Sequence, residues 1–315
     1  MSQVPSPVTL AQALAVAERQ GYAVGSFAPR YTAMIRPILR AGERSRSPLI
    51  VQVSQREMDR YGIDAAGFAQ AFFDGLAAER TSVPVVLHLD HTFDIPVIEA
   101  AIAAGFTSVM IDKSALPFED NLRITREVVG IAHARGVSVE AELGKIGTTD
   151  FVETDEDEEH FTDPDEAGLF VERTGVDALA VAVGTAHGHY VTRRPRVDLD
   201  RLAAIRARTP VRLVLHGGSG VPPEMIQSAI RLPGGGISKV NIATDLEHAM
   251  LGALGRTERM TDRECSALPP DLMRRAQEAV EAVVVEKIER FLGSAGQAEG
   301  FGRTGRAGRA GRDAA

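Results

Sequence analysis

The chain has 315 residues, a formal net charge of −8 and a hydrophobic content of 44%. This hydrophobic content is typical of a globular protein with a sizeable core, and the length allows one large barrel or two ordinary domains. The negative charge argues against a nucleic-acid-binding surface over the whole chain, and a single cysteine, Cys265, excludes an intramolecular disulfide. No apolar run reaches about 18 residues, the length of a membrane-spanning helix, and no secretory signal pattern is visible. We therefore expect a cytoplasmic protein whose partners are neither nucleic acids nor membranes.

Short apolar segments alternate with longer helical patterns along the chain. The short segments are rich in valine and leucine on both faces, as expected of parallel strands that are buried on both sides. We expect strands near residues 23–27, 49–53, 85–89, 108–111, 138–142, 178–183, 212–215 and 237–241. We expect helices over residues 32–46, 65–79, 94–104, 118–135, 164–174, 198–207 and 222–230, with more helices after Asp245.

Eight strand–helix units in one chain predict an α/β fold of the (β/α)8 TIM barrel type. A doubly wound open sheet is the competing fold, but it would usually show a Gly-x-Gly-x-x-Gly turn after the first strand. Ser26-Phe27-Ala28-Pro29 stands in that place. We therefore expect a single barrel domain over residues 1–294.

Two segments differ from this pattern. Residues 148–163 carry a dense run of acidic side chains, which predicts a mobile, solvated loop. Residues 295–315 repeat Gly-Arg-x and have few apolar side chains, which predicts a disordered tail.

Nearly every predicted strand ends in a polar residue that a purely structural role would not need. In a TIM barrel these carboxyl-terminal ends meet at one mouth, where the catalytic groups gather. The sequence therefore predicts a site at this mouth, built from Ser26, Ser54, Asp90, His91, Asp112, Glu142, His187, His216, Asn241 and Thr244.

Three of these residues, His91, His187 and His216, follow strands three, six and seven. Each alone could be a buried histidine that is hydrogen-bonded to its neighbours. Together at one barrel mouth, three neutral imidazoles with a fourth position open predict a catalytic Zn²⁺ site. Co²⁺ or Fe²⁺ would suit the same ligands.

Asp90 directly precedes His91, which places a carboxylate beside the predicted cation. We interpret Asp90 as the group that transfers a proton, although a carboxylate here could also only orient a histidine. Adjacent residues of a strand point to opposite faces. We therefore expect the strand to end before Asp90, with Leu87 and Leu89 packed and His88 pointing elsewhere.

Asp112 and Glu142 end strands four and five. They could form salt bridges to Lys113 or Lys145, or they could hold a second divalent or monovalent cation beside the zinc. Glu140 lies two residues before Glu142 on the same strand face, and we expect it to be a structural acid inside the barrel.

The loops after strands seven and eight resemble phosphate-binding loops of barrels, which use backbone amides and a helix N-terminus. The first contains Gly217-Gly218-Ser219-Gly220, with Gly188 near it, and the second contains Asn241, Ile242, Ala243 and Thr244. Lys113 and Lys239 are the possible Schiff-base lysines. A lysine imine beside a metal would be redundant, so the sequence favours the metal route.

The motifs resemble those of the class II (metal-dependent) ketose-bisphosphate aldolases, which include the fructose- and tagatose-bisphosphate enzymes. The resemblance covers about residues 8–294, and its motifs occur in family order. They are Leu-His-Leu-Asp-His-Thr (87–92), Ser-Val-Met-Ile-Asp (108–112), Val-Glu-Ala-Glu-Leu-Gly (139–144), Ala-Val-Gly-Thr-Ala-His-Gly (182–188), Leu-His-Gly-Gly-Ser-Gly (215–220) and Lys-Val-Asn-Ile-Ala-Thr-Asp (239–245).

The resemblance implies a lyase that reversibly cleaves a phosphorylated ketose to dihydroxyacetone phosphate and an aldehyde such as glyceraldehyde 3-phosphate. Fructose 1,6-bisphosphate is the default substrate, and tagatose bisphosphate or another ketose phosphate is the alternative. The resemblance implies a homo-oligomer, a dimer or tetramer. It further implies zinc on His91, His187 and His216, proton donation by Asp90, and a second cation near Asp112 and Glu142. It implies that Ser54, Gly188, Gly217, Gly218, Ser219, Asn241, Ile242, Ala243 and Thr244 lie at the substrate.

The sequence departs from the family pattern at Ala28, Lys113 and residues 268–271, and Asp150 matches poorly the acid of the family's mobile loop. These departures leave the aldehyde partner open. Two other classes of protein are possible. One is a barrel metallohydrolase, which would normally have a His-x-His motif on strand one, and the other is a non-catalytic metal-binding relative. The first strand has no histidine, and Asp90 and the zinc histidines are all present, so the aldolase is favoured.

Overall fold

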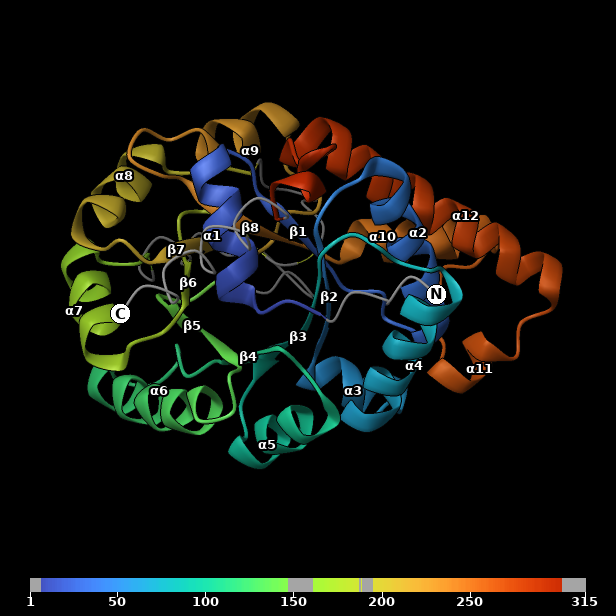
Figure 1. Ribbon diagram of the computed structural model, residues 1–315, viewed down its shortest axis with the longest axis horizontal. Coiled ribbons are helices and arrows are strands. Elements are labelled where there is room, and N and C mark those ends of the chain that lie inside the picture. The colour runs from blue at the N-terminus through green and yellow to red at the C-terminus, as the bar shows by residue number, and fades with distance from the viewer. Residues whose placement is uncertain (1–6, 147–160, 187, 189–194, 302–315) are drawn as a thin grey trace, which may run out of the picture.

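The computed structural model describes residues 7–146, 161–186, 188 and 195–301. Within them, eight parallel strands close into a barrel in chain order, with helices around the outside (Figure 1). This confirms the predicted (β/α)8 TIM barrel. The strands are β1 Val24–Phe27, β2 Leu49–Ser54, β3 Val85–Thr92, β4 Ser108–Ile111, β5 Ser138–Leu143, β6 Ala178–Val181, β7 Arg212–Leu215 and β8 Ile237–Ile242.

The helices follow the predicted pattern, including further helices after β8, with additions at the start of the chain and after β2. None of those described is long and apolar enough to cross a membrane. They are α1 Leu10–Gln20, η1 Thr32–Met34, α2 Ile35–Ser45, α3 Gln55–Tyr61, α4 Ala65–Ala78, α5 Ile95–Ala104, α6 Phe118–His133, α7 Pro164–Thr174, α8 Leu199–Arg208, α9 Pro223–Ile230, α10 Thr244–Ala253, α11 Asp262–Ser266, α12 Pro270–Glu286, the π-helix η3 Lys287–Leu292 and η4 Gln297–Glu299.

Helix α1 covers the amino-terminal end of the barrel, and the sequence analysis did not predict it. The helix begins with a capping box, in which Thr9 and Gln12 bond each other's backbone amides. Its buried Leu10 and Leu14 belong to the same apolar cluster as Val24 of β1, at the bottom of the barrel interior. In Figure 1 this helix lies across the barrel. A ligand must therefore approach the interior from the opposite, carboxyl-terminal mouth.

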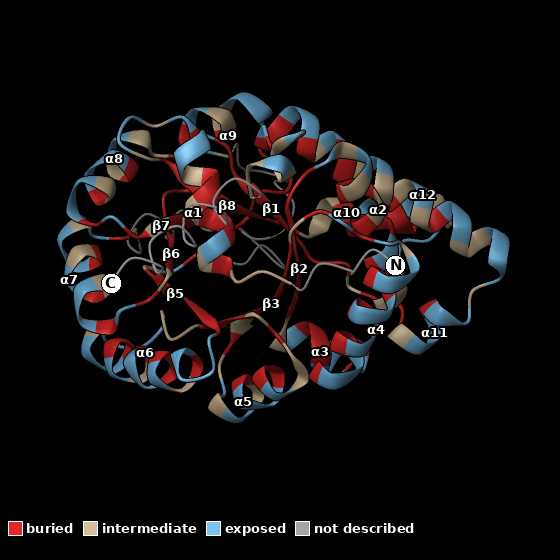
Figure 2. Cartoon of the chain, in the orientation of Figure 1, coloured by how far each residue is buried: buried red, intermediate tan, exposed pale blue. Residues whose placement is uncertain are grey.

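The two faces of the strands differ in chemistry. The outward residues pack with the surrounding helices into one large apolar cluster, which includes Leu87 and Leu89 as expected. Figure 2 shows the strands buried within the ring of helices. The inward face, in contrast, carries buried polar and charged residues where many barrels have branched aliphatic ones. These are Ser26, Gln52, His88, Ser108, Glu140 and Lys239.

The described chain continues past the expected domain end at residue 294. The 3-10 helix η4 lies beyond it, and Arg46 forms an ion pair with Glu299 at 2.8 Å. Phe301 packs against the apolar cluster that contains α1. Residues 295–301 of the predicted tail therefore contact the barrel domain, and residues 302–315 lie outside the described part.

Two neighbouring phenylalanines of α4 test this packing. Phe72 is fully buried, whereas Phe73 is 37% exposed. We expect Phe72→Ala to lower the free energy of unfolding by about 3–5 kcal/mol, because it leaves a cavity between α4 and the barrel. Phe73→Ala should cost less than about 1 kcal/mol. Urea unfolding followed by circular dichroism measures both, and equal losses would contradict the packing described.

Candidate active site

A break in the register of β3 positions the first two residues of the site. The pairing of β3 with β4 shifts between Leu89 and Thr92, and His91 has a φ of 26°. The expectation that the strand ends before Asp90 is therefore wrong, since β3 runs on to Thr92. The shift in register, and not a strand end, allows both Asp90 and His91 to line the cavity at the barrel mouth.

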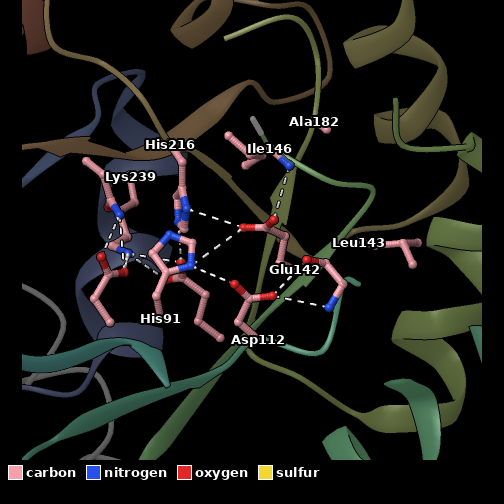
Figure 3. Close-up of polar contacts among 12 residues, drawn as sticks. His91, Asp112, Glu142, Leu143, Ile146, Ala182, His216 and Lys239 are labelled. Carbon is pink, nitrogen blue, oxygen red and sulfur yellow. Dashed lines mark hydrogen bonds and ion pairs between the residues drawn. The ribbon is translucent and has the colours of Figure 1, made fainter. Parts of the chain in front are cut away.

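Two imidazoles meet at this mouth. The ring centroids of His91 and His216 are 4.5 Å apart, and Asp90, His91 and His216 each offer a ligand atom within 4.8 Å of the others. Figure 3 shows the rings converging from β3 and from the end of β7. The third predicted zinc ligand, His187, lies outside the described residues, as does Asp150.

Carboxylates fix the orientation of both rings. The Nδ1–H of His91 donates to Asp112 Oδ2 at 2.8 Å (Figure 3). The Nε2–H of His216 donates to Glu140 Oε1 at 3.0 Å. A carboxylate behind a histidine sets which ring nitrogen carries the lone pair that a metal needs. These bonds assign the metal-facing lone pairs to Nε2 of His91 and Nδ1 of His216.

A second group of possible ligand atoms lies beside the first, formed by His91, Asp112 and Glu142 within 4.8 Å. Among the described residues, Asp112 pairs with His91 and Ser114 and not with Lys113. Glu142 Oε2 is buried, and it lies 3.5 Å from Nδ1 of His216 and 4.0 Å from Nδ1 of His91. Burial and the nearby Asp112 raise the pKa of Glu142 to about 8. Two buried carboxylates that lie side by side form an environment that a bound cation would stabilise.

Asp90 is held by two amides that the sequence analysis did not pair with it. Gln52 Nε2 donates to Asp90 Oδ2 at 2.9 Å, and Asn241 Nδ2 lies 3.2 Å from both carboxylate oxygens. Burial alone would raise the pKa of Asp90, but the charge of His91, the adjacent His88 and Lys239 together hold it well below its usual range. Asp90 is therefore an ionised carboxylate in this site. The alternation of side chains along β2 places Gln52 on the same face as Ser54, which was predicted to lie at the site. This alternation is the sequence signal that could have identified Gln52 as a site residue.

Two interior residues confirm part of the sequence analysis. Glu140 is fully buried and pairs with Lys239 at 2.8 Å, so it is the structural acid that was expected inside the barrel. The ammonium of Lys239 lies in this pair below the mouth, with no exposed surface. This placement does not favour Lys239 as a Schiff-base nucleophile.

The loops after β7 and β8 approach each other closely. A side chain at Gly217 would place its Cβ 2.2 Å from the carbonyl oxygen of Ala186, and one at Gly218 would meet Asn241 O at 2.9 Å. The Ser219 hydroxyl accepts from the amides of Ala243 and Asp245, each at 3.3 Å. Only glycine allows this contact, which joins the residues of both predicted phosphate loops beside the N-terminus of α10.

The site opens into a cavity of about 720 Å³. Asp90, His91, Asp112, Glu142 and the predicted phosphate-loop residues Gly188, Gly217, Ser219, Asn241, Ala243 and Thr244 line it, and so does Ser54, the N-cap of α3. Sequence reasoning missed five basic residues of this cavity, which come from the segment after β1, from α3, from α10 and from the loop after α10. They are Arg30, Arg56, Arg60, His248 and Arg259.

Two of these arginines are balanced by buried acids. Arg30, with a φ of 63°, pairs with Glu57 and lies 3.8 Å from Glu247, and Arg259 donates to Glu247 at 2.8 Å. Burial would raise the pKa of Glu247, but Arg30 and Arg259 outweigh it and lower that pKa. This wall of the cavity therefore combines positive groups with fixed carboxylates.

Residues 8–297 match a family model described as fructose-bisphosphate aldolase class-II. The chain belongs to the class-II fructose-bisphosphate aldolase family. Its relatives include the fructose-bisphosphate aldolases of Thermus caldophilus, 40% identical over 89% of this chain and 96% of that protein, and of Giardia intestinalis, 35% identical over 89% and 91%. The solved YdjI aldolase of Escherichia coli K12 is 34% identical, with a TM-score of 0.77 over 92% of this chain and 99% of that one. Membership confirms the expected family and makes the chain a class-II aldolase, a lyase of a family that acts on phosphorylated sugars.

Two glycines with similar backbone angles test the loop contact of this aldolase. Gly217 and Gly136 have φ values of 67° and 70°, but a Cβ at Gly136 would meet nothing within 4 Å. We expect Gly136→Ala to cost about 1 kcal/mol of stability and to leave kcat/KM unchanged. Gly217→Ala must displace the loop and should lower kcat/KM about 10²-fold. Steady-state kinetics with thermal unfolding measures this, and equal kinetics for the two variants would contradict it.

Proposed function

We propose that this class-II aldolase is zinc-dependent and reversibly cleaves a ketose 1,6-bisphosphate to dihydroxyacetone phosphate and an aldehyde. Fructose 1,6-bisphosphate is the proposed substrate, and glyceraldehyde 3-phosphate is then the aldehyde. One observation carries the proposal: Asp90, His91 and His216 bring a carboxylate and two oriented imidazoles within 4.8 Å at the barrel mouth. His187 would complete the set of three imidazoles. The second position, at Asp112 and Glu142, would take a further cation.

Cleavage of the carbon–carbon bond next to a ketone leaves negative charge on the fragment that keeps the ketone. A zinc ion held by the three histidines would supply Lewis-acid stabilisation of that charge. Asp112 and Glu140 hold two of the imidazoles in the tautomer that this requires. The protein thereby orients the site before any substrate binds, which is the main source of electrostatic catalysis.

Asp90 is the proposed proton carrier on the aldehyde side. In the cleavage direction its carboxylate takes the proton of the hydroxyl group that becomes the aldehyde, and in the reverse direction it returns that proton. The amides of Gln52 and Asn241 hold the carboxylate in one position at the mouth.

The phosphate of the dihydroxyacetone half would bind where the β7 and β8 loops meet. Gly188, Gly217, Gly218 and Ser219 form one side, and Asn241 to Thr244 lead into α10 on the other. A helix N-terminus with nearby backbone amides is a favourable anion site. Binding energy from this remote phosphate can then contribute to the positioning of the reacting carbons.

The purified protein should cleave fructose 1,6-bisphosphate, lose this activity in EDTA and regain it with Zn²⁺ or Co²⁺. A coupled assay of triose phosphate release measures the reaction, and tagatose 1,6-bisphosphate serves as the comparison substrate. Full activity in the chelator, with borohydride trapping of a substrate adduct, would contradict the metal route and support an imine. A preference for tagatose 1,6-bisphosphate would correct the substrate and keep the mechanism.

Asp90→Ala should retain the metal and lower kcat by about 10²–10⁴-fold, because the variant lacks the proton carrier. Metal content by atomic emission and kcat by the same assay separate these two effects. Asp94→Ala, a change of an exposed carboxylate four residues later, is the matched control and should keep wild-type turnover. Normal turnover in Asp90→Ala would remove Asp90 from the mechanism.

A further inference from the structure

A buried cluster below the active site contains three side chains that could together bind a metal. His88 and Asp90 of β3 and Glu140 of β5 each offer a ligand atom within 4.8 Å of the others. His88 and Glu140 have no exposed surface, and Asp90 is only 5% exposed. The cluster shares Asp90 with the site at the mouth. A cation bound there would therefore compete directly with the proposed use of Asp90 as proton carrier.

The ammonium of Lys239 fills the centre of this cluster. Its Nζ lies 2.8 Å and 3.0 Å from the two oxygens of Glu140, 3.3 Å from Nε2 of His88 and 3.9 Å from Oδ1 of Asp90. Lys239 reaches across the barrel from β8 and is itself fully buried. An ammonium has three N–H donors and no acceptor, and the contacts with Glu140 and His88 account for all three donors.

The contacts also define the state of His88. Because Lys239 can only donate, Nε2 of His88 must accept, and its proton lies on Nδ1, which donates to Ser108 Oγ at 2.8 Å. His88 is then a neutral imidazole with a lone pair directed at the cation. This is the same arrangement that a histidine adopts as a metal ligand. The site is therefore built for a cation, and the chain supplies that cation itself.

We propose that Lys239 is a resident cation that occupies this inner metal-like site and excludes a divalent ion from it. The ammonium neutralises Glu140, so that Glu140 Oε1 stays directed at Nε2 of His216 at 3.0 Å. It also leaves Asp90 unligated at the mouth, where its carboxylate can exchange a proton. Lys239 is in this sense a positioning residue. The inference rests on the proposed function only for the role of Asp90.

Removal of the ammonium should convert the cluster into a real metal site. Lys239→Ala leaves His88, Asp90 and Glu140 facing a space without a counter-charge, and a divalent ion would replace it. We expect metal-free Lys239→Ala to bind one more equivalent of Co²⁺ than the wild-type chain, with an additional visible absorption band. The kcat of the metal-loaded variant should fall by about 10²–10⁴-fold, since Asp90 becomes a ligand.

Two further variants separate this effect from a general structural one. Adding His88→Ala to Lys239→Ala removes one ligand and should return the Co²⁺ stoichiometry to the wild-type value. Lys287→Ala, which removes the other strongly paired lysine, bonded to Asp245 at 2.6 Å, should keep the wild-type stoichiometry and spectrum. These measurements use no substrate, so they remain valid if the wild-type chain fails to cleave fructose 1,6-bisphosphate.

Thermal unfolding provides a second readout, because a ligand that binds only the folded state stabilises it by mass action. The melting temperature of Lys239→Ala should rise more with Co²⁺ than that of the wild-type chain. A variant that binds the wild-type number of Co²⁺ ions with an unchanged spectrum would overturn the proposal. A variant that stays unfolded at every Co²⁺ concentration would overturn it as well.

Discussion

The register break in β3 is the local feature on which the active site depends. In a regular strand Asp90 and His91 would face opposite sides, and His91 would enter the apolar layer between the barrel and its helices. The positive φ of His91 turns the second side chain back into the mouth. Such a backbone conformation costs of order 1–3 kcal/mol in a non-glycine residue and persists only where its surroundings fix it. Here the hydrogen bond to Asp112 and the ring contact with His216 hold the imidazole in place.

The barrel interior can be described as three levels. At the bottom, α1 and the inward residues of the strands form an apolar plug. In the middle lies a buried ion pair between Lys239 and Glu140, and at the top lie Asp90, His91 and His216. The top level depends on the middle one, because Glu140 orients His216 and is itself neutralised by Lys239, and a buried charge without a partner is strongly destabilising. The interior of the barrel thus contains polar and charged side chains, which orient the active-site residues, in place of apolar ones. The outer apolar cluster provides most of the hydrophobic stabilisation.

The sequence predicted the parts of the fold that follow from periodicity. Valine- and leucine-rich segments located all eight strands, and the polar residues after them located the mouth, because the ends of parallel strands meet on one side. The family resemblance over residues 8–294 agrees with the match over residues 8–297. Glu140 was correctly placed inside the barrel, and Leu87 and Leu89 are packed as expected.

Other features depend on contacts between distant segments and could not be read from local patterns. The bulge at His91 arises from pairing with β4, and a linear sequence shows no periodicity for it. Helix α1, by contrast, has a local signal that the sequence analysis missed, which is the capping box of Thr9 and Gln12. The role of Gln52 depends on a side-chain contact between strands. The register of β2 with β3 pairs Gln52 with His88, and only the hydrogen bond from its amide shows that Gln52 reaches Asp90.

The central claim is that a cation binds at the mouth between the oriented imidazoles and not in the interior. Anomalous diffraction at the zinc edge, from crystals of the zinc-loaded protein, tests this claim most directly. The account predicts one strong peak about 2.0–2.1 Å from Nε2 of His91 and from Nδ1 of His216. A peak bound by His88 and Glu140, or imidazoles of His91 and His216 that do not share one ion, would contradict it.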